Sequence, residues 1–70
     1  MVFPFKVVND FQVSTGRIFV FNNNDPRVKT LNVDDIITTN NGCWKLLESV
    51  TSERFFRIRD NKAFFVRKIN

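Results

Sequence analysis

The chain has no histidine, no tyrosine, a single cysteine and only two glycines. Without histidine the commonest general base is missing, and a Ser–His or Cys–His nucleophile pair cannot form. Cys43 cannot form an internal disulfide, nor can it supply the four Cys or His ligands of a structural zinc site. Gly16 and Gly42 lie too far apart for a glycine-rich phosphate loop. We therefore expect a non-enzymatic protein without a metal or a cofactor.

The acidic residues offer no evident catalytic pair. Asp34 and Asp35 are adjacent, and on a strand their side chains would point to opposite faces. We expect them to serve a turn or the entry to a strand. Cys43 is expected to be a small strand residue, because a reactive thiol needs a cationic neighbour and only Lys45 is near in sequence.

Long apolar runs are also missing. No stretch approaches the roughly 20 apolar residues of a membrane span. The first residues, MVFPFKVV, are interrupted by Pro4 and Lys6 and do not resemble a signal peptide. Because the sequence opens with Met1, we expect a complete small protein. We also expect a cytoplasmic, reducing setting, which suits a lone free thiol, and no membrane association.

Size and composition predict one domain over residues 1–70 with an aromatic core. Without disulfide or zinc, that core must come from ordinary packing or from a partner subunit. Nine Phe and one Trp supply the apolar bulk. The nine Asn and nine Phe also favour an AT-rich source such as a phage.

Turn residues divide the chain into short segments typical of strands. We expect a first strand near residues 3–8, starting late or at an edge because Pro4 has no N–H to donate. A turn is predicted at 14–16, a buried strand at 17–21 and a loop at 22–25 that Pro26 closes. Residues 28–33 are expected to be extended or irregular, and 48–53 a helical turn or a loop.

The clearest hairpin is DDIITTNNGCWKLLE, residues 34–48. Asn-Gly between two β-like runs favours a type I′ turn, here at Asn41–Gly42. That turn pairs Thr39 with Trp44 and Ile37 with Leu46. One face of the hairpin then holds Ile37, Thr39, Trp44 and Leu46, and the other holds Ile36, Thr38, Lys45 and Leu47. No run of ten residues has helical periodicity, so we expect an all-β protein, a small barrel or a tightly curved sheet.

Residues 31–48, LNVDDIITTNNGCWKLLE, resemble the centre of an SH3 domain. In that family a Gly-Asp/Glu-apolar-Ile strand leads through a polar turn into a Gly-Trp-Trp-Lys strand. FVF at 19–21 falls where the family has Ala-Leu-Tyr-Asp-Tyr, and FVRKI at 65–69 resembles the closing Tyr-Val-x-x-Ile. The resemblance spans residues 19–69 and implies an SH3-like barrel of five to six short antiparallel strands. An OB-like barrel remains the alternative.

The peptide-binding groove of SH3 domains is not matched. By register the groove Trp falls at Cys43, and Trp44 matches the second, more structural Trp. The groove tyrosines are missing, and NKA at 61–63 does not follow the Pro-Ser-Asn pattern before the closing strand. Binding of proline-rich peptides is therefore not implied.

Positive charge gathers near the C-terminus. Residues 1–35 are neutral, whereas residues 54–70 carry six cations against Asp60 alone, a net charge of +5. Such asymmetry is typical of a polyanion-binding face.

The last predicted hairpin, RFFRIR-DN-KAFFVRK, arranges these cations. A turn at Asp60–Asn61 puts Phe56, Phe65, Ile58 and Ala63 on an inner face, with Arg54 and Arg67 toward its open end. The outer face then holds Arg57, Arg59, Lys62, Phe55, Phe64 and Val66, with Lys68 beyond them. We expect Arg57, Arg59, Lys62, Arg67 and Lys68 to neutralise phosphates, and Phe55 and Phe64 to stack on bases. Cations interleaved with aromatic platforms are typical of single-strand binders. We expect nucleic acid as the partner, with single strands favoured.

Three alternatives stay open. The charges can protect an edge strand while Phe55, Phe64 and Val66 pack under another strand. An acidic protein can be the partner, with Trp44 and Lys45 as contact residues, although Trp44 also fits a core position. The phenylalanine-rich strands can instead form a homodimer.

Overall fold

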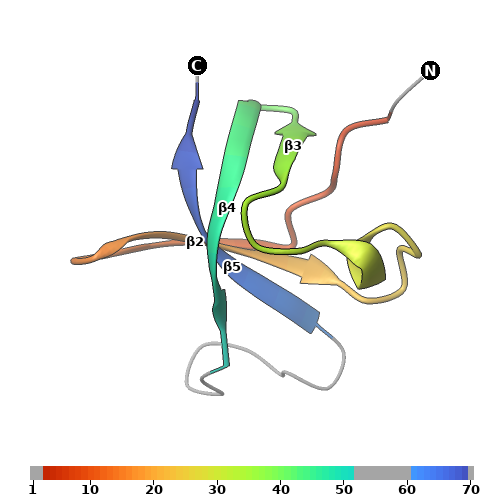
Figure 1. Ribbon diagram of the computed structural model, residues 1–70, viewed down its shortest axis with the longest axis horizontal. Coiled ribbons are helices and arrows are strands. Elements are labelled where there is room, and N and C mark those ends of the chain that lie inside the picture. Colours follow the sequence, from red (N-terminus) through yellow and green to blue (C-terminus); the bar gives the residue numbers. More distant parts are fainter. Residues whose placement is uncertain (1–2, 52–60, 70) are drawn as a thin grey trace.

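The computed structural model describes residues 3–51 and 61–69, which form one antiparallel sheet (Figure 1). The elements are β1 (Asn9–Val13), β2 (Gly16–Asn22), the 3₁₀ helix η1 (Val28–Thr30), β3 (Ile36–Thr39), β4 (Gly42–Val50) and β5 (Asn61–Lys68). The strand order is β1-β2-β5-β4-β3. The predicted all-β class is confirmed.

The N-terminal segment links two distant parts of the sheet. Phe5 forms a single parallel bridge with Thr39 of β3, and its N–H donates to the Thr38 carbonyl at 2.8 Å. Three residues later, the N–H of Val8 donates to the Val20 carbonyl of β2, also at 2.8 Å. The predicted strand at 3–8 is therefore wrong. This segment passes from β3 to β2 instead of following one strand, and the first strand begins at Asn9.

Strands β2 and β5 are the centre of the sheet and are apolar on both faces. Their register pairs Ile18 with Phe65, Phe19 with Phe64 and Val20 with Ala63. Side chains therefore alternate between two apolar clusters, not between core and solvent. The main core consists of Phe19, Phe21, Val28, Leu31, Ile37, Trp44, Leu46, Phe64 and Val66. The second cluster consists of Ile18, Val20 and Ala63, with Phe11, Val13, Val50 and Phe65 packed against it.

A β-bulge on β4 serves this two-sided packing. Leu46 pairs with Val66, but Glu48 pairs with Phe65, so Leu47 is the extra residue. Beyond the bulge, the register places Val50 opposite Ala63, where it packs on the second cluster. A helical turn or loop was predicted at residues 48–53. This is wrong for residues 48–50, because β4 continues to Val50.

The β3–β4 hairpin has the predicted faces but a different turn. Thr39 pairs with Gly42 and Ile37 with Trp44, so the turn lies at Asn40–Asn41, one residue earlier than predicted. Neither Asn has the positive φ that a type I′ turn requires, whereas Gly42 has φ +118°. Moving the turn by one residue changes the partner of each β3 residue by two positions on β4. Each residue therefore stays on its predicted face, although Ile37 now pairs with Trp44 instead of Leu46. The side chains of Ile37, Thr39, Trp44 and Leu46, which were predicted to share one face, are all buried.

The acidic pair before β3 builds a turn, as predicted. The Asp35 carboxylate accepts the Asn32 N–H at 2.8 Å, and the Asp35 N–H donates to the Asn32 carbonyl at 3.2 Å. Asp34 adopts φ +77°, and its N–H donates to the Leu46 carbonyl at 2.7 Å. These bonds start the β3–β4 pairing.

Arg27, in the loop before η1, contacts the N-terminal segment. Its guanidinium donates to the Phe3 carbonyl at 2.6 Å and lies 4.3 Å from the centre of the Phe5 ring. The same group pairs with the Asp25 carboxylate at 2.9 Å, and the Arg27 N–H donates to that carboxylate at 3.0 Å. Asp25 thus orients the arginine that fixes the path of residues 3–5.

A buried side-chain hydrogen bond in the core can be tested by substitution. The indole N–H of Trp44 donates to the Thr39 hydroxyl at 3.0 Å. Replacing Thr39→Val removes the acceptor from a buried donor, and we expect a loss of about 1–3 kcal/mol in the free energy of unfolding. The adjacent and exposed Thr38→Val is the control and should change it by less than about 0.5 kcal/mol. Urea unfolding of both variants measures this, and equal losses would contradict the assignment.

The Asp25–Arg27 pair predicts a pH dependence. The side-chain hydrogen bond from Arg27, helped by the Arg27 N–H, lowers the pKa of Asp25 below its ordinary 3.8. Because the folded pKa is depressed, the pair stabilises the fold above pH 3.8 and loses this effect as the pH falls through the folded value.

Unfolding midpoints of the protein and of Asp25→Asn should therefore differ at neutral pH and converge in acid. In an Arg27→Gln background, the effect of Asp25→Asn should lose this pH dependence. A difference that persists unchanged in acid would contradict the proposed pair.

Candidate functional site

The structure describes only part of the predicted basic hairpin. Phe55, Arg57 and Arg59, together with the predicted turn residue Asp60, lie outside the described residues. Asn61 is the first residue of β5. Four predicted site residues of this hairpin can therefore be placed: Lys62, Phe64, Arg67 and Lys68.

Phe64 does not lie on an exposed face. Its side chain is 1% exposed and belongs to the main core, so its predicted role as a stacking platform is corrected. Val66 is buried as well, whereas Phe65, predicted to face inward, is only half-buried. The physical reason is that β5 is a central strand with apolar clusters on both faces. A two-residue periodicity therefore does not separate core from solvent here.

Lys62 is engaged inside the protein. Its ammonium donates to the Leu31 carbonyl at 2.8 Å and lies 5.6 Å from the centre of the Phe64 ring. This interaction ties the start of β5 to the end of η1. Binding a phosphate through Lys62 would require breaking it.

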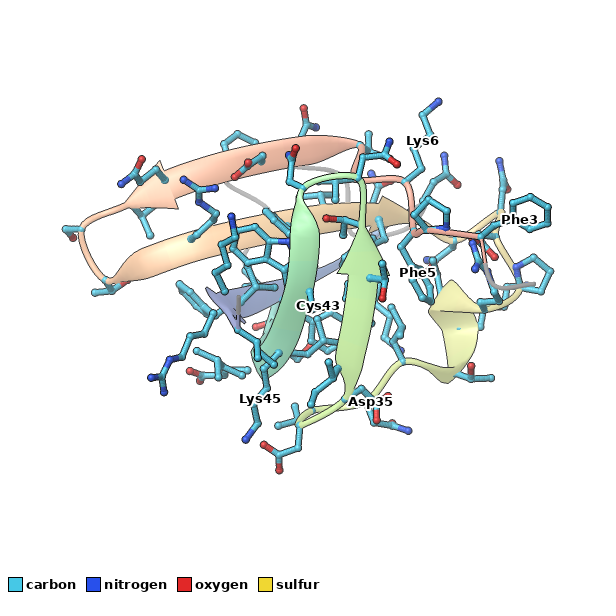
Figure 2. The ribbon with its side chains drawn as sticks, turned by 90° about the horizontal axis from the view of Figure 1, so that it is seen from above. Phe3, Phe5, Lys6, Asp35, Cys43 and Lys45 are labelled. Atoms are coloured by element: carbon cyan, nitrogen blue, oxygen red, sulfur yellow. The ribbon has the colours of Figure 1, made fainter. Side chains whose placement is uncertain are left out.

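Trp44 is a core residue. It is 4% exposed, donates to Thr39, and packs edge-on against Phe19 with ring centres 4.6 Å apart. The core interpretation is confirmed, and a role as an exposed contact residue is wrong. Lys45 projects outward from β4 (Figure 2), where its ammonium lies 4.0 Å from the Asp34 carboxylate.

Four cations from three strands meet at one end of the sheet, which we call the basic end: Arg17, Lys45, Arg67 and Lys68. The register places Arg17 opposite Val66, Lys45 opposite Arg67 and Lys68 opposite Trp44. Sequence reasoning missed Arg17 because it lies in the neutral half of the chain. Only the pairing of β2 with β5 brings it to the C-terminal cations.

The basic end is incompletely neutralised. Arg17 lies 3.6 Å from the Asp10 carboxylate, and Lys45 is 4.0 Å from Asp34. Within residues 3–51 and 61–69, no carboxylate comes within 4.0 Å of Arg67 or Lys68. Both side chains are exposed.

The four cations divide between the two faces of the sheet. Lys45 and Arg67 are direct partners on the outer face, which they share with Ile36. Arg17 and Lys68 lie on the inner face, above the indole of Trp44. The Arg17 guanidinium is 5.5 Å and the Lys68 ammonium 5.8 Å from the centre of that ring.

A hollow opens beside Arg17 and Lys68, which we call the mouth pocket. Its volume is about 740 Å³. Its lining residues are Gln12, Val13, Ser14, Gly16, Arg17, Asn41, Trp44, Val66 and Lys68. The lining contains two cations and no carboxylate. Two further hollows each include an acid, Glu48 in one and Asp25 in the other.

This arrangement of cations can attract an anion. Among the described residues, no group of three or more Cys, Asp or Glu side chains is placed to hold a metal ion. Cys43 is half-buried, with its sulfur 3.8 Å from the Thr38 hydroxyl. It occupies an ordinary strand position.

Comparison of the chain with protein-family models, curated proteins and solved structures finds no match. In the part of the chain that the structure describes, no helix has the length and apolar character needed to cross a membrane.

Proposed function

We propose that this chain is a non-enzymatic binding protein that associates with nucleic acid, preferentially single-stranded, through its basic end. The observation that carries the proposal is the convergence of Arg17, Lys45, Arg67 and Lys68 from three strands. Such a cluster attracts the phosphate backbone, whose neutralisation supplies most of the sequence-independent affinity.

The Lys45–Arg67 pair is a second observation that favours binding of an external anion. These side chains are directly opposed on neighbouring strands, and like charges in this position destabilise a sheet. The Asp34 carboxylate, 4.0 Å from the Lys45 ammonium, partly offsets the charge of Lys45 but not that of Arg67. A phosphate between the two strands would relieve the repulsion, and arginine offers it a paired hydrogen-bonding geometry.

Salt and charge removal test the proposal. Affinity for a labelled single strand, followed by anisotropy, should fall linearly with salt on a log–log plot. Lys45→Gln with Arg67→Gln should weaken binding and reduce the slope by about 0.7 for each phosphate that the protein no longer neutralises.

The matched control removes the same charge elsewhere, with Lys6→Gln and Lys29→Gln, both exposed residues away from the basic end. This control should leave the affinity much closer to that of the unmodified protein. Equal weakening in the two double variants would show that net charge alone, not the basic end, governs binding.

A second candidate is an acidic protein partner on the outer face. There, Ile36 is 64% and Ile69 48% exposed, next to Lys45 and Arg67. An apolar patch edged by cations suits an acidic segment with apolar side chains. Absence of oligonucleotide binding at about 150 mM salt would favour this candidate. Sedimentation at several protein concentrations would test self-association through the same face.

A further inference from the structure

We propose that the mouth pocket seats one unstacked nucleotide of the bound strand, with Arg17 and Lys68 holding its phosphate. This inference rests on the proposed function and assigns a ligand to one part of the basic end. It also explains the preference for single strands, because the base of a paired nucleotide is not free to enter a pocket.

The electrostatics of the pocket favour a phosphate. Arg17 and Lys68 both line the pocket and both lie within 6 Å of the Trp44 ring centre, so the two charges are at most about 11 Å apart. Asp10 contacts one terminal nitrogen of Arg17, at 3.6 Å, and the half-exposed guanidinium has further N–H donors. An anion in the pocket would be attracted by both cations, and the lining holds no carboxylate to compete with it.

The rest of the lining suits a base and a sugar. A volume of about 740 Å³ is in the range of small-molecule pockets. Val13 and Val66 offer apolar contact. The exposed amides of Gln12 and Asn41 and the hydroxyl of Ser14 offer donors and acceptors for base edges.

The chain provides a matched pair of variants. Arg67 and Lys68 are neighbours on β5, both exposed, with Lys68 on the pocket face and Arg67 on the outer face. Lys68→Gln and Arg67→Gln remove the same charge from almost the same place. Trp44 is the single tryptophan, so its fluorescence reports on the pocket.

The experiment titrates the full chain with four probes: a labelled oligothymidylate, thymidine 5′-monophosphate, thymidine and inorganic phosphate. We expect the oligonucleotide and the monophosphate to change Trp44 emission. Lys68→Gln should weaken monophosphate binding by about tenfold, and Arg67→Gln, which lies outside the pocket lining, by less than about threefold, although both should weaken oligonucleotide binding. Thymidine without phosphate should leave the emission unchanged.

The outcomes separate the pocket from the proposed function. If the oligonucleotide binds, with equal losses of monophosphate binding in both variants and unchanged Trp44 emission, the pocket assignment is overturned and the proposed function stands. If the monophosphate alone changes the emission while the oligonucleotide does not bind, the pocket takes nucleotides and the proposed function fails. A response to inorganic phosphate as strong as that to the monophosphate overturns the nucleotide assignment. No response to any probe overturns both.

Discussion

The pairing of β2 with β5 is the constraint on which the rest of this structure depends. Both strands are apolar at successive positions, so each must be covered on two faces. Burying a large apolar side chain stabilises by about 1.5–3 kcal/mol, and these strands carry six buried ones. The bulge at Leu47 follows from this requirement, because it sends Val50 to the second cluster while Leu46 stays in the main core.

The same pairing assembles the basic end. Where the apolar segments of β2 and β5 stop, Arg17 and Lys68 occupy the next inward positions beside Val66 and Trp44. At this end of the main core, Arg17 and Lys68 therefore lie against the ring of Trp44 and separate it from solvent. Cation–π interactions of this kind are worth about 0.5–1 kcal/mol at exposed sites, which is less than a charged ligand can contribute. The position of these cations thus serves packing, and in our proposal it serves anion binding as well.

Much of the fold could be predicted from the sequence, but less of the site. The β3–β4 faces could be predicted because the Asn-Gly signal locates the turn to within one residue, and a shift of the turn by one residue leaves the same side chains on each face. The predicted exposure of Phe64 was wrong. On a strand that is buried on both faces, the alternation of side chains between the faces does not distinguish buried from exposed positions. Arg17 was missed because its position beside Lys68 is a consequence of long-range strand pairing, which no local pattern encodes. The phosphate-neutralising roles of Arg57 and Arg59, which lie outside the described residues, stay predictions.

Amide chemical-shift mapping would show whether nucleic acid binds at the basic end. The ¹⁵N-labelled protein would be titrated with a short single strand at about 150 mM salt, where weak nonspecific attraction between charges is screened. We expect the largest shifts at Arg17, at residues 67 and 68, and at the indole N–H of Trp44. Shifts confined to the opposite end of the sheet, around η1 and Asp25, would contradict it, as would an unchanged spectrum.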